Sequence, residues 1–130
     1  MAALADSPSG LAAWIVEKFQ RWSDCGGDVE RRFTKDDLLT TVMPYWVTGC
    51  IATSFRPYRD DHLAPELPLV RVPAGITVSV EDVGLPREFA ERTYADIRHW
   101  REPSRGGHFF AMEEPVFLAE ELRTFFRGLR

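Results

Sequence analysis

The chain has 130 residues, of which 45% are hydrophobic and 28% are charged, and its net charge at pH 7 is −4. These values are typical of one soluble globular domain with a modest core. The acidic balance argues against nucleic acid or an anionic membrane as the partner, and no apolar run reaches the ~18 residues of a membrane span. No secretory signal is expected, and Cys25 and Cys50 lack metal-binding spacing. We therefore expect a cytoplasmic protein that uses neither a metal nor a cofactor.

A first helix is predicted near the N-terminus. Asp6-Ser7-Pro8 supplies an N-cap side chain followed by proline at the first helical position. Gly26-Gly27 is expected to end this helix. Apolar residues recur between these limits at the spacing of one helical face: Leu11, Trp14, Ile15, Phe19 and Trp22.

A second helix is predicted to begin after Thr34, which forms a variant capping box with Asp37 three residues later. Pro44 lies inside the apolar pattern of this helix. Because proline removes a hydrogen bond and clashes with the preceding turn, we expect a kink or break near Met43. Residues 48–54 could continue as helix, and residues 56–62 are expected to form a loop.

The second half of the chain alternates strand and helix signals. β-branched runs at residues 69–72 and 76–80 predict strands, with an interruption at Pro73-Ala74-Gly75, and residues 97–100 predict a short third strand. Residues 86–94 predict a helix that turns Phe89 and Ala90 inward, and residues 115–126 predict the last helix. The apolar face of the last helix is expected to hold Val116, Leu118, Leu122, Phe125 and Phe126.

A histidine behind two glycines, in Arg105-Gly106-Gly107-His108-Phe109, stands out between the last two of these elements. Glycine can take φ > 0 and lets the backbone approach a neighbour closely. The strand upstream ends in two acids, Glu81 and Asp82, and a helix follows the histidine. Strand-end acid, glycine-turn histidine and closing helix form the final part of an α/β-hydrolase, whose catalytic partners run nucleophile, acid, histidine along the chain.

Five stretches, in order, resemble the microsomal-type epoxide hydrolases, a branch of the α/β-hydrolases, and they match the C-terminal part of that family. They are residues 6–15 (DSPSGLAAWI), 29–33 (VERRF), 45–49 (YWVTG), 54–58 (SFRPY) and 105–109 (RGGHF). Glu113-Glu114-Pro115 also fits. The resemblance implies an α/β fold that lacks part of its sheet. Residues 1–62 would be a helical segment derived from the lid, and residues 63–130 would hold the last two strands and helices of the core.

The resemblance also implies a chemistry, the hydrolysis of epoxides to vicinal diols. In the family, an aspartate opens the epoxide to form an alkyl-enzyme ester, and a histidine held by an acid activates the water that hydrolyses the ester. By position, His108 resembles this general base, and Tyr58 resembles a lid tyrosine that donates a proton to the epoxide oxygen. The acid that orients the histidine is either Asp82 or Glu81. Only one of the two can normally reach the imidazole, because adjacent strand residues point to opposite faces.

The aspartate nucleophile has no counterpart in the chain. Gly26-Gly27-Asp28 imitates the family's nucleophile elbow, but a predicted helix precedes it where the elbow needs a strand. His62 and His99 have no spaced partner that would make a metal site. We therefore expect the chain alone to be inactive on epoxides, because removing one member of a catalytic unit abolishes most of its catalysis.

Two other interpretations stay open. The chain could be a non-catalytic remnant or interaction module of an α/β-hydrolase, which self-associates through an exposed strand edge. It could also derive from a different α/β-hydrolase, such as a haloalkane dehalogenase. Arg56-Pro57-Tyr58 and residues 105–109 argue against the dehalogenase. The partner expected for the completed enzyme is a small-molecule epoxide.

Overall fold

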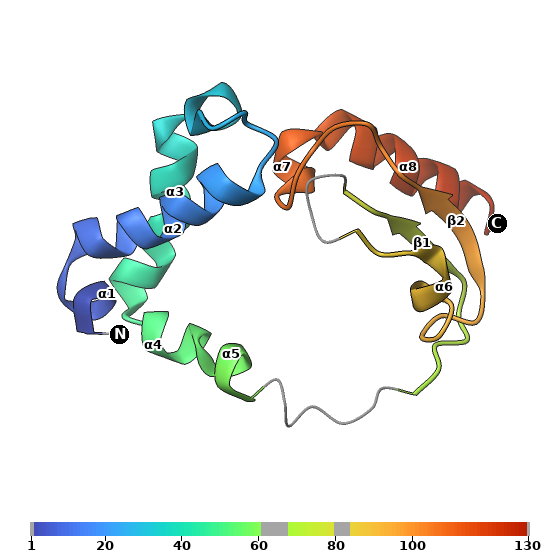
Figure 1. Ribbon diagram of the computed structural model, residues 1–130, viewed down its shortest axis with the longest axis horizontal. Coiled ribbons are helices and arrows are strands. Elements are labelled where there is room, and N and C mark those ends of the chain that lie inside the picture. The colour runs from blue at the N-terminus through green and yellow to red at the C-terminus, as the bar shows by residue number, and fades with distance from the viewer. Residues whose placement is uncertain (1, 61–67, 80–83, 130) are drawn as a thin grey trace. The chain divides into compact units, whose positions relative to one another are not determined.

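The structure is a computed structural model that describes residues 2–60, 68–79 and 84–129 (Figure 1). Contacts divide the chain into two compact units. The helical unit comprises Met1–Arg21 and Cys25–Glu66, and the strand unit comprises Trp22–Asp24 and Leu67–Arg130. The boundary predicted between residues 62 and 63 lies outside the described residues. The three residues Trp22–Asp24 are the unexpected part of this division, because they join the strand unit from the end of an N-terminal helix.

The helical unit is built from short helices around a small apolar core. Three buried side chains, Leu11, Val42 and Ile51, form this core, and Tyr45 and Phe55 are among the partly buried residues packed against it. The helices are α1 (Ala2–Asp6), α2 (Pro8–Trp22), the 3₁₀ helix η1 (Val29–Arg31), α3 (Lys35–Thr48), α4 (Ile51–Ser54) and α5 (Arg56–Asp60).

Helix α2 confirms the first predicted helix. The hydroxyl of Ser7 accepts a hydrogen bond from the backbone N–H of Gly10 at 3.2 Å, so Ser7 satisfies one of the free donors of the first turn. Gly26 and Gly27, with φ of 61° and 84°, follow the helix in conformations that glycine adopts readily. The sequence did not predict α1, which precedes α2.

Helix α3 begins as predicted. The hydroxyl of Thr34 accepts from the Asp37 N–H at 3.1 Å, and the Asp37 carboxylate accepts from the Thr34 N–H at 2.9 Å. Of the kink or break predicted near Met43, the break is wrong, since the helix continues through Pro44 to Thr48. Leu38 and Val42 are buried one turn apart, and this packing holds the helix together at a position where proline disfavours it.

Helix α3 is capped at its C-terminus by Gly49, which has φ of 64°, and α4 follows. The predicted loop after residue 55 is also wrong, because residues 56–60 form α5. Pro57 lies in the first turn of α5, where the missing N–H of proline has no helical acceptor to serve. Among the described residues, no single helix is long and apolar enough to cross a membrane. Helix α3 and residues 51–60 pass that test only together, across a bend of 108°.

The strand unit contains two parallel strands, β1 (Ala74–Thr77) and β2 (Ile97–Arg101), with Thr77 opposite Arg101. Its helices are α6 (Arg87–Ala90), α7 (Phe110–Glu113) and α8 (Pro115–Arg127). Parallel strands with intervening helix confirm the predicted α/β class. The predicted strand at residues 69–72 is reduced to one bridge between Val70 and Tyr94, and β1 begins inside the predicted interruption at Ala74.

Helix α8 packs on this pair of strands at Gly75, where an added Cβ would lie 2.9 Å from the ring of Phe125. Leu118 and Phe125 are half-buried, as predicted. The rest of the predicted apolar face is exposed, with Val116, Leu122 and Phe126 exposed by 71%, 49% and 57%. In α6, Ala90 is buried as predicted, whereas Phe89, which was expected to point inward, is 52% exposed.

Candidate active site

The predicted histidine turn, residues 105–109, connects β2 to α7. Gly106 has φ of 94°, which glycine adopts without strain. A Cβ on Gly107 would lie 2.5 Å from the backbone oxygen of Trp22 and 2.7 Å from the Cα of Ser23. The two glycines therefore do what the sequence predicted: one turns the chain, and the other lets a second segment approach the turn.

That second segment is Trp22–Asp24, and it is hydrogen-bonded to the turn. The backbone N–H of His108 donates to the carbonyl oxygen of Trp22 at 2.7 Å. The N–H of Gly106 donates to the carboxylate of Asp24 at 3.1 Å. The segment Trp22–Asp24 thus packs against the histidine turn, from which it is more than eighty residues away in sequence.

The side chain of His108 is exposed and lies against two aromatic rings. Its imidazole is 5.1 Å from the ring of Trp22 at 63°, and 5.2 Å from the ring of Phe109 at 84°. Both are edge-on arrangements, in which one ring presents its positive edge to the face of the other. An imidazole that is both exposed and flanked in this way can reach a water molecule while its plane is restricted, which suits a general base.

Two acids that follow the turn are buried against it. The carboxylate of Glu113 accepts hydrogen bonds from backbone N–H groups of the turn, at 3.1 Å from both Gly107 and Phe109. Glu114 forms an ion pair of 3.0 Å with Arg105. Both glutamates are 8% exposed. The sequence placed Glu113 and Glu114 only at the start of the last helix, and their contacts with the turn were missed.

Tyr58, the predicted proton donor, lies on α5 in the helical unit and is 74% exposed. Its ring is 5.8 Å from that of Phe55, which packs against the core of that unit. The aromatic contact anchors the base of the side chain and leaves the phenol open to a ligand. The two candidates for the orienting acid, Glu81 and Asp82, lie outside the described residues, as does His62.

The remaining candidates of the sequence have structural roles. Asp28 follows a helix, as the sequence predicted, and its carboxylate accepts from the N–H of Glu30 at 3.2 Å to cap η1. It is therefore a helix cap, without the strand that a nucleophile elbow needs. The Nε2 of His99 lies 2.6 Å from the carboxylate of Glu121. Among the described residues, no group of three His, Cys, Asp or Glu side chains could hold a metal ion.

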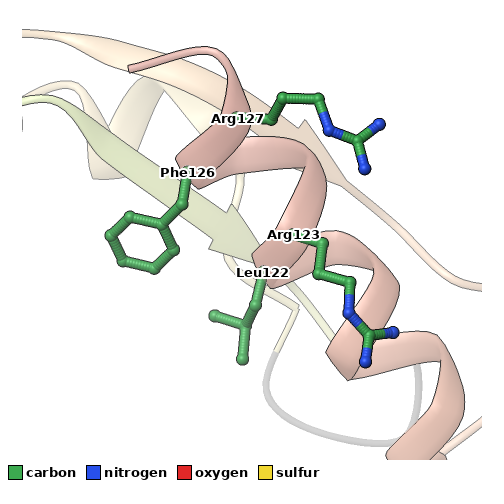
Figure 2. A pocket seen from close by; sticks show the side chains of 4 residues that line it. All are labelled: Leu122, Arg123, Phe126 and Arg127. Carbon is green, nitrogen blue, oxygen red and sulfur yellow. The ribbon is translucent and has the colours of Figure 1, made fainter. Parts of the chain in front are cut away.

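A surface hollow of about 470 Å³ lies along α8 and is lined by Leu122, Arg123, Phe126 and Arg127. Figure 2 shows Leu122 and Phe126 projecting from one side of the helix and the two arginines from the other. None of the four side chains is an acid, a histidine or a nucleophile. The hollow therefore holds no group for the chemistry that the histidine turn suits.

No family model matches the chain, but curated proteins named as epoxide hydrolases do. One from Stigmatella aurantiaca is 44% identical over 98% of this chain and 30% of its own length. Epoxide hydrolase 1 of Sus scrofa is 38% identical over 95% of this chain and 30% of its own length. This chain thus spans about 30% of the length of the curated relatives it matches.

Solved structures give the same relationship. The juvenile hormone epoxide hydrolase of the silkworm Bombyx mori matches with a TM-score of 0.87 and 30% identity, over 97% of this chain and 35% of that chain. The Aspergillus niger epoxide hydrolase matches with a TM-score of 0.71 and 27% identity, over 98% of this chain and 32% of that chain. Along nearly its whole length, the chain is therefore related to the C-terminal part of the epoxide hydrolases of the α/β-hydrolase fold.

Proposed function

We propose that this chain supplies the general base, His108, and a proton donor, Tyr58, to an epoxide hydrolase whose nucleophilic aspartate belongs to the part of the fold that this chain does not cover. The chain spans only 35% of the silkworm structure it matches. Its substrate class would be a small epoxide, and its product a vicinal diol. On its own the chain is expected to be inactive.

In the first proposed step, the aspartate carboxylate attacks an epoxide carbon and the carbon–oxygen bond of the ring breaks. Tyr58 donates its phenolic proton to the oxygen that leaves the ring. A phenol suits this task because it is protonated near neutral pH, when the developing alkoxide needs a proton. The product of this step is an ester between the aspartate and the hydroxyalkyl group.

In the second proposed step, His108 takes a proton from water, and the resulting hydroxide adds to the ester carbonyl. The acyl carbon–oxygen bond then breaks, which releases the diol and restores the aspartate carboxylate. The imidazolium returns its proton to the leaving alkoxide, and the proton of the regenerated carboxyl group passes to the Tyr58 phenolate left by the first step. A base that forms a cation during the step needs an orienting acid, and Asp82 and Glu81 are the two candidates for it.

The observation that carries this proposal is the position and exposure of His108. The histidine follows a parallel strand, sits on a turn that only glycine permits, and precedes the closing helices α7 and α8. This is the order in which an α/β-hydrolase presents its base. The contact of Gly107 with the backbone of Trp22 and Ser23 fixes the place of the turn that carries the histidine.

A chimera tests the proposal. The segment of the silkworm juvenile hormone epoxide hydrolase that matches this chain is replaced by residues 1–130, and juvenile hormone serves as the substrate. We expect diol formation by the chimera. We expect His108→Gln to lower turnover about 100-fold or more, while an ester intermediate accumulates and is seen as added mass on the intact protein.

The control is His99→Gln, which changes the other described histidine and keeps an amide that can donate to Glu121. This variant should form diol without accumulating the ester. Full turnover by the His108→Gln chimera would contradict the proposal. Diol formation by the pure chain, lost on His108→Ala, would contradict the expected inactivity.

A second candidate function is binding through the open side of the strand unit. Among the described residues, β1 pairs only with β2, so its other edge presents backbone donors and acceptors to a partner. Helix α8 also exposes Val116, Leu122 and Phe126. A concentration-dependent dimer in light-scattering measurements, weakened by Phe126→Ser, would favour this function. A monomer at all concentrations would argue against it.

A further inference from the structure

The backbone of the histidine turn is held by hydrogen bonds to acceptors outside the turn. The N–H groups of four successive residues each donate to an acceptor outside the turn. Gly106 donates to Asp24, and His108 donates to the carbonyl of Trp22. Gly107 and Phe109, on either side of the histidine, both donate to Glu113. The conformation of the turn is therefore imposed by these acceptors.

Glu113 is the acceptor that joins the histidine turn to the segment Trp22–Asp24. Its Oε2 accepts from Gly107 at 3.1 Å and from the N–H of Asp24 at 2.8 Å, and its Oε1 accepts from Phe109 at 3.1 Å. One carboxylate thus ties the segment Trp22–Asp24 to both neighbours of His108. An ionised carboxylate is an acceptor only, with sites for about four donors, and bonds to it are stronger than bonds between neutral groups.

We propose that Glu113 is the positioning residue of His108. It acts through the backbone on both sides of the histidine, and it holds the imidazole in one orientation for the attack of water on the ester. The catalytic meaning of this role rests on the function proposed above, whereas the role of Glu113 in ordering the turn does not.

Burial explains why a carboxylate is needed there. Gly107 is buried and Glu113 is 8% exposed, so water cannot readily replace the hydrogen bonds between them. A glutamine has nearly the same shape but only one accepting oxygen. Its NH₂ group would have to face either the N–H of Phe109 or the N–H groups of Gly107 and Asp24. The donors that it faces would be left unsatisfied.

Amide hydrogen exchange in the isotope-labelled chain tests the inference without activity. In Glu113→Gln we expect exchange at Gly107 or Phe109 to accelerate about tenfold or more, the loss of roughly one hydrogen bond, with β2 amides unchanged. The matched control is Glu114→Gln, whose carboxylate is equally buried but contacts the Arg105 side chain. That variant should leave exchange at Gly107 and Phe109 within about twofold.

A second measurement covers the case in which Glu113→Gln fails to fold. Scalar couplings across hydrogen bonds, from the Gly107 and Phe109 nitrogens to the side-chain carboxyl carbon of Glu113, should be detectable in the unsubstituted chain. Their absence, or unchanged exchange at both amides in Glu113→Gln, would overturn the ordering role.

The positioning role is then tested in the chimera described above. Glu113→Gln should slow breakdown of the ester while leaving the rate of its formation and the KM for epoxide within about twofold, because only the base is misplaced. An equal loss in both steps would overturn the positioning role. If the unsubstituted chimera forms no ester, the proposed function fails, and the exchange data still decide whether Glu113 orders the turn.

Discussion

The Nε2 of His99, on β2, lies 2.6 Å from the carboxylate of Glu121, on α8. The two side chains are only 18% and 12% exposed, so the contact is largely removed from water. The same carboxylate oxygen lies 3.3 Å from the Nε of Arg101. A polar cluster therefore joins α8 to β2 beside the apolar contact that Phe125 makes with Gly75.

We predict that Glu121→Gln destabilises the strand unit by about 1–2 kcal/mol. The substitution removes a charge-assisted hydrogen bond to a half-buried histidine and the ion pair with Arg101. The measurement is urea unfolding followed by an optical signal. Glu120→Gln, at the exposed neighbouring position, is the control and should change the free energy of unfolding by less than about 0.5 kcal/mol. Equal urea unfolding midpoints for Glu121→Gln and Glu120→Gln would contradict the prediction.

Gly107→Ala should destabilise the strand unit by about 1–3 kcal/mol. The added Cβ would lie 2.5 Å from the Trp22 oxygen and 2.8 Å from the Asp24 nitrogen, which are backbone atoms that cannot rotate away. Thermal unfolding measures the effect. The control is Gly84→Ala, where no atom lies within 4 Å of the new Cβ. The prediction fails if both variants unfold at the same temperature.

Thr34→Ala should cost about 1 kcal/mol by removing the cap of α3. The cost should depend on pH, because hydrogen bonds from the Thr34 side chain and backbone hold the pKa of Asp37 below its usual value of 3.8. A carboxyl whose pKa is lowered in the folded state adds stability above its unfolded pKa and loses it as the pH falls through the folded pKa. The difference between variant and parent should therefore narrow below pH 3.8. Urea unfolding midpoints of both proteins, measured above and below pH 3.8, test this prediction. A stability difference that does not change with pH would refute it.

Tyr58→Phe in the chimera should lower the rate of ester formation by about 100-fold. The variant keeps the ring that contacts Phe55 and removes only the proton donor. Single-turnover kinetics separate ester formation from ester breakdown. Tyr45→Phe is the control within the same unit, since that side chain packs on the core. Equal rates in the two variants would remove Tyr58 from the mechanism.

Local signals explain which helices could be predicted from the sequence. The apolar spacing that defines α2 and the Thr34–Asp37 capping box both lie within a few neighbouring residues, and both are confirmed. Pro44 and Pro57 led to wrong predictions for a shared reason. The free energy that proline costs a helix depends on its place in the helix and on the packing around it. The neighbouring residues in the sequence do not reveal either one.

The histidine turn could be located from its glycines, but its supports could not. The hydrogen bond from the Asp24 N–H to Glu113 joins residues that are 89 positions apart. No periodic pattern marks such a pair. The available signal was two successive acids, Glu113 and Glu114, placed directly after an apolar stretch that follows the turn. Their roles as buried acceptors become visible only when the crossing segment Trp22–Asp24 is in place.

Two hydrogen bonds that hold the histidine turn join residues 82 and 89 positions apart in the sequence. These separations also affect when the turn can form during folding. Contacts of high sequence separation require the closure of a long loop, and they slow folding relative to local contacts. Helices α2 and α3 can form while the chain is being synthesised. The turn forms later, because Glu113 must first be synthesised and meet Asp24. We therefore expect its amides to acquire protection last during refolding, after those of helices α2 and α3.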